Sequence, residues 1–267
     1  MTILEKIFQY KKLELEERKK KRSLQDIQKQ ITDTKSDKNS LFKKLQNDSS
    51  FHFICEVKKA SPSKGIIQPD FDPVKYAKCY QDGGATAISV LTDEHFFQGH
   101  LDYLTKIKNI VNIPVLRKDF IFDEYQIFEA KLARADIILL IAKILDRDAI
   151  QNLTNLALEL GMDVLFEIAN RDEIKKIPVN LPVIVGINNR NLENFTLDLR
   201  RSIQLGQLLP PHLPRIAESG IQSVTDCQKL FQAGFNGALI GELFMRSPDP
   251  RSLIRQYVRE VNHAHSA

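Results

Sequence analysis

The sequence has 267 residues, of which 43% are hydrophobic and 27% charged, as is typical of one large globular α/β domain or two small ones. No apolar run reaches the ~18 residues of a membrane-spanning helix, and the charged N-terminus lacks an apolar signal core, so we expect a cytoplasmic protein that is not exported. The three cysteines (Cys55, Cys79 and Cys227) are widely spaced, which argues against a disulfide framework and against a zinc site.

Residues 1–50 carry the net positive charge, with 13 Lys and Arg against 8 Asp and Glu, whereas the other 217 residues hold 25 against 26. The basic run at 18–22 raises nucleic-acid binding as a hypothesis. However, the acidic stretch "ELEE" directly precedes it, and interleaved charges are more typical of a solvated helix face. We therefore interpret residues 1–50 as an N-terminal helical extension packed on a barrel formed by 51–267, and expect no nucleic-acid partner.

After residue 50, short apolar runs alternate with amphipathic stretches. The runs are rich in β-branched residues, as expected of strands buried on both faces. They cover residues 51–57, 86–91, 113–118, 135–141, 162–168, 182–187, 214–219 and 237–241. Helix-start signals stand between them at Asp72-Pro73, Asp123, Asp146 and Ser223. A further helical stretch covers 247–261.

Eight such strands, each followed by a helix or loop, predict a (β/α)8 TIM barrel, an α/β fold that typically takes ~250 residues. The alternative is a doubly wound open sheet. That fold would favour a Gly-x-Gly-x-x-Gly turn after an early strand, and the sequence has none. We therefore predict a single barrel domain with an N-terminal helical extension.

Polar residues end five of the predicted strands, at the edge where barrels build their sites. They are Glu56, Lys58, Lys118, Glu167, Asn188, Arg190 and Glu218. One charge at a strand end is ordinary, but convergence of several indicates a functional site, because buried unpaired charges are costly. Residues on a strand alternate in direction, so Glu56 and Lys58 share the mouth face while Cys55 and Val57 face the helices.

Small residues suggest that the same mouth binds a phosphate group. Ser61 begins a Ser-Pro-Ser-Lys-Gly turn after the first strand. Ser219-Gly220 and Gly241-Glu242 follow the seventh and eighth strands, where barrels commonly bind phosphate through backbone N–H groups. Glycine leaves room for the phosphate oxygens to approach the backbone. The sequence thus indicates a small phosphorylated substrate.

With these residues in place, the chain resembles the indole-3-glycerol-phosphate synthase family of tryptophan biosynthesis. The matching stretches are "EVKKASPSKG", "ISVLTDEHFFQG", "PVLRKDFIFDEYQI", "ADIILLI", "GINNRNL", "IAESGI" and "LIGELFMR". The resemblance implies a carboxy-lyase that needs neither cofactor nor metal. Its substrate would be 1-(2-carboxyphenylamino)-1-deoxyribulose 5-phosphate, which closes to an indole ring and loses carbon dioxide and water. We expect a monomer, with association with other tryptophan-pathway enzymes left open.

The resemblance also implies roles for the catalytic residues. Lys118 would be the general acid for ring closure, and its pKa would have to be lowered by burial and by like charge. Glu167 would assist proton transfer in the dehydration, and Glu56 would orient Lys118 and stabilise the cationic intermediate. Lys58 would hold the anthranilate carboxylate, and whether it also donates a proton stays open.

Substrate-binding roles follow from the resemblance in the same way. Asn188 and Glu218 would bind hydroxyl groups, and Arg190 would support the charged cluster. Phe96 and Phe97 would wall the anthranilate ring, with plain loop packing as an equal alternative. The phosphate cradle would be formed by Ser61, Ser219, Gly220, Gly241 and, through its backbone N–H, Glu242.

Two other enzyme classes remain as alternatives. A Schiff-base aldolase would use a strand-end lysine as its nucleophile. Phosphoribosylanthranilate isomerase would need a Cys early in the barrel and an Asp in the middle; Cys55 faces the helices by alternation, and we predict no Asp at a strand end. Two positions also depart from the family pattern. His100 would weaken a helix cap, whereas Asn170 can still provide one.

Overall fold

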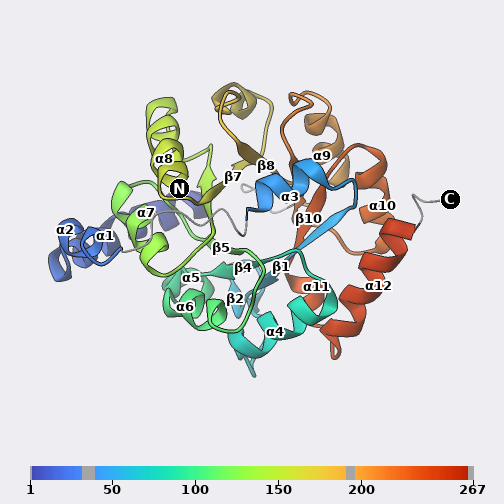
Figure 1. Cartoon of the computed structure of the whole chain (residues 1–267), viewed down its shortest axis with the longest axis horizontal. Coiled ribbons are helices and arrows are strands. Elements are labelled where there is room, and N and C mark those ends of the chain that lie inside the picture. Colours follow the sequence, from blue (N-terminus) through green and yellow to red (C-terminus); the bar gives the residue numbers. More distant parts are fainter. Residues whose placement is uncertain (1, 32–39, 191–195, 264–267) are drawn as a thin grey trace.

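The computed structural model describes residues 2–31, 40–190 and 196–263 (Figure 1). Within these ranges, eight parallel strands close into a barrel in the order β1-β10-β9-β8-β7-β6-β5-β4. They are β1 (His52–Val57), β4 (Ala87–Leu91), β5 (Val115–Lys118), β6 (Ile137–Ile141), β7 (Asp163–Ile168), β8 (Val183–Asn188), β9 (Arg215–Glu218) and β10 (Gly237–Ile240). The predicted (β/α)8 barrel is confirmed, and every predicted strand is present.

Helices surround the barrel, and four of them begin directly after the predicted caps Asp72, Asp123, Asp146 and Ser223. The side chain of Asp72, for example, accepts the backbone N–H groups of Val74 and Lys75, and Gly84 ends the same helix with a φ of 98°. The outer helices are α4 (Pro73–Gly83), α5 (Glu94–Phe97), α6 (Asp102–Lys108), α7 (Glu124–Leu132), α8 (Arg147–Glu159), α9 (Leu199–Gly206), α10 (Val224–Gln232), α11 (Glu242–Met245) and α12 (Pro250–His263), with a 3-10 turn η2 (Asp172–Lys176). None of the described helices is long and apolar enough to cross a membrane.

Strand alternation separates two apolar layers and sets the direction of the charged residues. Cys55 and Val57 pack in the outer layer between the strands and the helices, as predicted. Ile54, Leu116, Leu165 and Ile216 fill the barrel interior. Two residues after each of these, at the mouth, stand Glu56, Lys118, Glu167 and Glu218. The period of two thus places apolar side chains inside the barrel and charges at its end.

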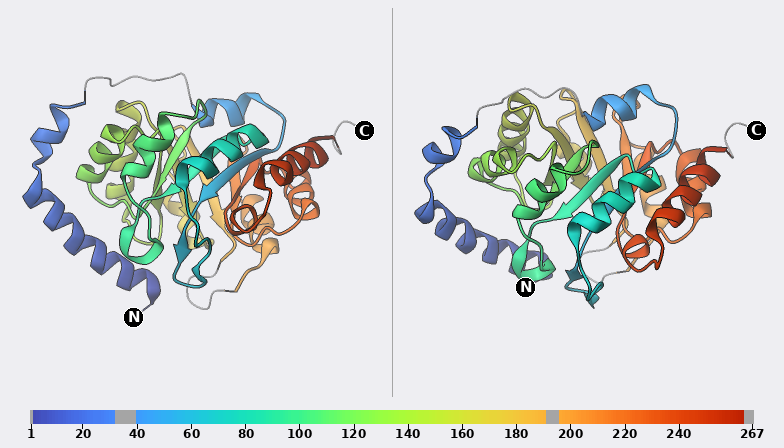
Figure 2. Two further views of the ribbon diagram at one scale, coloured as in Figure 1. Left: turned by 90° about the horizontal axis from the view of Figure 1, so that it is seen from below. Right: turned by 60° about the horizontal axis from the view of Figure 1, so that its bottom comes forward.

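Residues before the barrel reach both of its ends (Figure 2). Helix α3 (Leu41–Asn47) places Leu41 and Leu45 against the barrel interior at the amino ends of the strands. Asp163, at the start of β7, accepts the backbone N–H of Phe42 at 3.0 Å and so fixes this helix. Helix α1 (Ile3–Lys21) begins at the opposite end of the barrel, where its first turn reaches the mouth. Helix α2 (Leu24–Gln28) follows it.

Candidate active site

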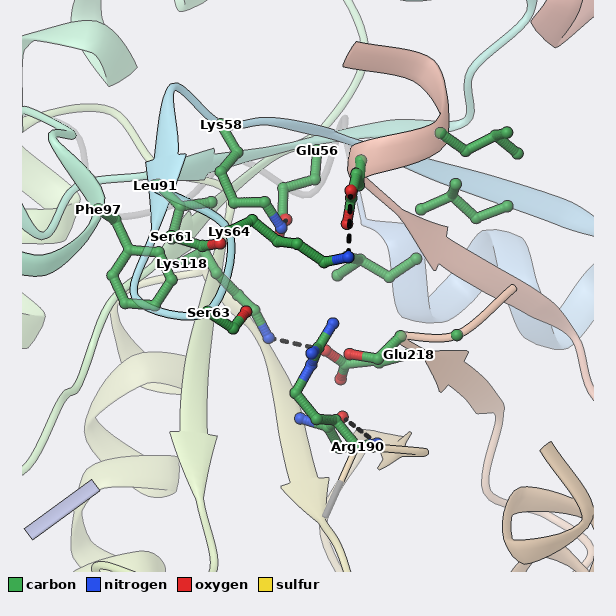
Figure 3. Close-up of a pocket in the computed structure, with 18 of the residues that line it drawn as sticks. Glu56, Lys58, Ser61, Ser63, Lys64, Leu91, Phe97, Lys118, Arg190 and Glu218 are labelled. Atoms are coloured by element: carbon green, nitrogen blue, oxygen red, sulfur yellow. Dashed lines mark hydrogen bonds and ion pairs between the residues drawn. The ribbon is translucent and has the colours of Figure 1, made fainter. Parts of the chain in front are cut away.

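A cavity of about 790 Å³ opens where the carboxyl ends of the strands meet, a size typical of small-molecule sites. The candidate residues that line it are Glu56, Lys58, Ser61, Phe97, Lys118, Glu167, Asn188, Arg190, Glu218, Ser219, Gly220, Gly241 and Glu242 (Figure 3). The cavity thus brings together residues that follow the first strand of the barrel and residues that follow the last. Ile3, Leu4 and Ile7 of α1 add an apolar side to it.

Lys118 is the centre of the charged cluster. Its Nζ donates to Glu167 Oε2 at 2.9 Å and to Glu218 Oε2 at 2.7 Å. Burial lowers the pKa of Lys118, but the carboxylates of Glu167 and Glu218 outweigh it, and the charge of Glu56 adds to their effect. The pKa of Lys118 therefore lies above its ordinary value. This corrects the prediction of a lowered pKa, and it leaves the ammonium protonated, as a general acid must be.

The two carboxylates beside Lys118 have different proton affinities. Burial raises the pKa of Glu218 to about 7, because the opposing pull of Lys118 does not offset it and Glu167 adds repulsion. Burial also acts on Glu167, but there the charge of Lys118 and the amide of Asn188, at 2.9 Å, prevail and lower the pKa. Two neighbouring carboxyl groups with separated pKa values are what paired acid and base steps require.

Gly186 makes room for Glu218, a role that sequence reasoning missed. A Cβ on Gly186 would collide with Glu218 Oε1, and this buried oxygen has no hydrogen-bond partner among the described residues. Gly186 lies on β8 opposite Glu167 in the strand register. A glycine at an inward position of a central strand is the signal that could have revealed a close approach.

Glu56 and Lys58 form a second ion pair in the cavity, through Glu56 Oε1 and Lys58 Nζ. The sequence predicts that Glu56 orients Lys118, whereas Lys118 donates its hydrogen bonds to Glu167 and Glu218. Glu56 thus acts on Lys118 through charge, and its carboxylate accepts a hydrogen bond from Lys58. A Cβ on Gly241 would lie 2.5 Å from Glu56 Oε1, so glycine is needed there for a steric reason as well.

The predicted phosphate-binding residues lie together on the β10 side of the mouth. Ser219 and Gly220 both adopt left-handed backbone conformations, with φ of 66° and 73°. A serine in this region is strained, and such strain is often kept where a binding site requires it. Ser61 faces the same cavity from the hairpin after β1, and Gly241 and Glu242 face it from β10 and α11.

The two candidate phenylalanines separate. Phe97 lines the cavity, whereas the ring of Phe96 packs against Tyr10 at 5.7 Å and His95 at 4.7 Å, outside the cavity lining. Strand alternation could not predict this, because both residues lie on the single turn of α5. Of the two phenylalanines predicted to wall the anthranilate ring, Phe97 lines the cavity and Phe96 does not.

An Asp does stand at a strand end, contrary to the prediction. Asp119 follows β5 and is buried, with Oδ1 3.0 Å from Lys11 Nζ and Oδ2 3.1 Å from an Arg117 nitrogen. Burial would raise the pKa of Asp119, but Lys11 and Arg117 prevail and hold it well below its usual range. The thiol of Cys55 faces the helices, and burial raises its pKa. Cys55 therefore points away from the cavity and Asp119 is engaged by two cations, which disfavours an isomerase that would pair a Cys with an Asp.

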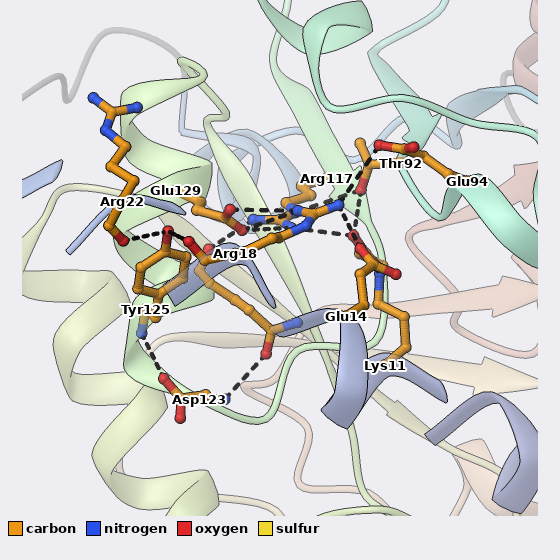
Figure 4. Close-up of polar contacts among 12 residues, drawn as sticks. Lys11, Glu14, Arg18, Arg22, Thr92, Glu94, Arg117, Asp123, Tyr125 and Glu129 are labelled. Carbon is orange, nitrogen blue, oxygen red and sulfur yellow. Dashed lines mark hydrogen bonds and ion pairs between the residues drawn. The ribbon is translucent and has the colours of Figure 1, made fainter. Parts of the chain in front are cut away.

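The basic run at 18–22 is only partly solvated. Arg18 lies 3.3 Å from Glu129 (Figure 4), and Lys19 lies 2.7 Å from Asp123, so both bind carboxylates of the barrel. Lys20 is exposed and pairs with Glu17 of its own helix. The predicted solvated face is therefore wrong for Arg18 and Lys19, which instead hold α1 against α7.

The two departures from the family pattern have small structural effects. Nδ1 of His100 accepts the backbone N–H of Asp102 at 3.1 Å, so the start of α6 keeps a partner. Oδ1 of Asn170 accepts the N–H of Glu173 at 3.1 Å, so Asn170 supplies a hydrogen bond at the start of the 3-10 turn η2, although the cap residue of that turn is Arg171.

Comparisons with known proteins agree with this geometry. A family model described as indole-3-glycerol phosphate synthase matches residues 4–257. A protein of that name from Lacticaseibacillus paracasei is 41% identical over 255 residues, 96% of this chain and 98% of the relative. One from Lachnoclostridium phytofermentans is 45% identical over 214 residues, 80% of this chain and 79% of the relative.

Similar solved structures share the fold. Thiamine phosphate pyrophosphorylase from Pyrococcus furiosus has a TM-score of 0.57 at 15% identity, over 80% of this chain and 97% of its own. N-acetylmannosamine-6-phosphate 2-epimerase from Clostridium perfringens has a TM-score of 0.58 at 14% identity, over 84% of this chain and 98% of its own. Because these identities are low, they support the barrel alone, whereas the family match and the curated relatives cover most of the chain. The chain belongs to the indole-3-glycerol phosphate synthase family.

Proposed function

We propose that this protein converts 1-(2-carboxyphenylamino)-1-deoxyribulose 5-phosphate to indole-3-glycerol phosphate, carbon dioxide and water. The observation that carries the proposal is the contact of the Lys118 ammonium with Glu167 and Glu218 inside the cavity. This arrangement combines a protonated donor with two carboxylates of different pKa. Ring closure and dehydration both need such proton transfers.

In the first step, the aromatic carbon that bears the carboxylate attacks the ketone carbon, and Lys118 donates a proton to the ketone oxygen. Lys58, paired with Glu56 at the cavity wall, binds the anthranilate carboxylate until it leaves as carbon dioxide. The negative charge of Glu56 stabilises the cationic ring intermediate. Loss of carbon dioxide restores the aromatic ring and leaves a hydroxyl group on the newly closed ring.

In the second step, Glu167 accepts a proton from the ring carbon beside the nitrogen, and the Lys118 ammonium, reprotonated after ring closure, protonates the hydroxyl group, which leaves as water. Lys118 contacts Glu167 directly, so a proton can pass between them without a large movement. Asn188 and Glu218 bind the substrate's hydroxyl groups, while Arg190 supports the cluster. Ser61, Ser219, Gly220, Gly241 and the backbone of Glu242 receive the phosphate, which holds the reacting carbons near Lys118.

The test is a fluorescence assay with purified protein and the carboxyphenylamino-deoxyribulose phosphate. The chain contains no tryptophan, so an indole product is detected without interference from protein indole. We expect indole fluorescence to rise as substrate absorbance is lost. Substrate that remains unchanged in the presence of folded protein would refute the proposed reaction.

A further inference from the structure

The hairpin after β1 carries a lysine that the proposed chemistry does not use. Strands β2 (Ala60–Ser61) and β3 (Gly65–Ile66) pair across a tight turn, which the N–H of Lys64 closes on the carbonyl of Ser61 at 3.2 Å. Gly65 follows in the left-handed region with a φ of 62°. The turn extends the Lys64 side chain over the cavity toward its phosphate side (Figure 3).

The partner of Lys64 is the carboxylate of Glu242. Lys64 Nζ lies 3.7 Å from Glu242 Oε1, whereas Arg246 Nε donates to the same oxygen at 3.0 Å. The side chain of Lys64 is 47% exposed and that of Glu242 33%, so their long ion pair contributes little stability. Lys64 can therefore leave Glu242 at low cost, and Arg246 would still neutralise the carboxylate.

The other two lysines of the cavity are engaged more closely. Lys58 pairs with Glu56, and Lys118 is held by two carboxylates at the strand ends. A phosphate dianion bound at Gly241 would lie near the Glu242 carboxylate, which repels it unless cations intervene. Lys64 stands on the hairpin side of this carboxylate, within reach of the same space.

We propose that Lys64 selects for the substrate's phosphate by exchanging the Glu242 carboxylate for the phosphate dianion. This inference rests on the proposed function, which places the phosphate beside Glu242. The doubly charged group attracts the ammonium more strongly than a carboxylate that Arg246 already neutralises.

The experiment measures binding of inorganic phosphate by calorimetry, together with KM and kcat, for Lys64→Met, Lys64→Arg and Lys59→Met. Lys59 is the matched control, because it is the neighbouring lysine that does not line the cavity. Lys64→Met should weaken phosphate binding and raise KM by roughly five- to tenfold, with kcat within about twofold. Lys64→Arg should restore most of the affinity, and Lys59→Met should match the parent protein.

A second variant tests the exchange itself. Glu242→Gln removes the competing carboxylate but keeps the backbone N–H, so phosphate should bind more tightly than to the parent, and adding Lys64→Met should abolish most of that gain. Equal phosphate affinity in Lys64→Met and the parent, or no phosphate binding by the parent, would overturn the inference. Phosphate binding needs no turnover, so failure of the parent to form indole would refute the proposed reaction separately.

Discussion

The carboxylate of Glu218 occupies the space that a side chain on Gly186 would need. The same carboxylate reaches Lys118 with its other oxygen, at 2.7 Å. The absence of a side chain at Gly186 on β8 therefore allows Glu218 on β9 to hold Lys118 at the centre of the cavity.

Gly186→Ala should displace Glu218 and with it Lys118, and should reduce kcat by roughly a hundredfold, because misplacing a catalytic group such as Lys118 by about 1 Å can have that effect. The measurement is the rate of indole formation, with circular dichroism to verify folding. The control is a double-mutant cycle with Glu218→Ala. If the glycine acts through Glu218, Gly186→Ala should lower kcat only slightly in the Glu218→Ala background. An equally large loss of kcat in both backgrounds would contradict this role.

Glu218 should titrate near neutral pH in the free protein, since burial raises its pKa to about 7. Infrared difference spectra of the parent against Glu218→Gln should show a protonated carboxylic acid that disappears as the pH rises through about 7. A carboxylate already ionised near pH 5 would contradict the assignment.

The same shift predicts how stability depends on pH. A raised pKa in the folded state means that the folded protein binds this proton more tightly than the unfolded chain. The contribution of Glu218 is therefore fully present below its ordinary pKa of 4.5 and is lost as the pH rises through about 7. Urea unfolding at several pH values should show the parent losing stability relative to Glu218→Gln over this interval. If the free energies of unfolding of the two proteins changed with pH in parallel, the raised pKa of Glu218 would be contradicted.

Lys11→Met should lower the free energy of unfolding by roughly 3–5 kcal/mol, because it removes a buried partner of Asp119. Lys20→Met is the control, since the Lys20 side chain is 72% exposed and should contribute at most about 0.5 kcal/mol. Urea unfolding measures both. We also propose that the arm and barrel unfold in one cooperative transition, so separate transitions, or equal effects of the two variants, would contradict the account.

The barrel and the residues of its mouth could be predicted from the sequence for one physical reason. Strand alternation forces Glu56 onto the same side as Ile54, and Lys118 onto that of Leu116, whatever the distances between strands. Helix caps such as Asp72 are equally local. Both kinds of signal depend only on neighbours along the chain.

Other features depend on distances that the sequence does not carry. The raised pKa of Lys118 is a sum of burial and three carboxylates from different strands. The pairing of Lys11 with Asp119 joins residues far apart in the chain. The reach of Lys64 to Glu242 likewise depends on the conformation of a short hairpin. Local patterns therefore identified the participants, but the pairing among them required the fold.

In the proposed reaction, Lys118 supplies the proton for ring closure. The most direct measurement compares indole formation and substrate binding in Lys118→Met and the parent, with Lys59→Met as the control for loss of a lysine outside the cavity. We predict that Lys118→Met nearly abolishes indole formation while binding of the phosphorylated substrate largely survives. Borohydride should trap no adduct on the parent, because a protonated Lys118 is a poor nucleophile. Normal turnover by folded Lys118→Met, or a trapped adduct on Lys118, would contradict the account.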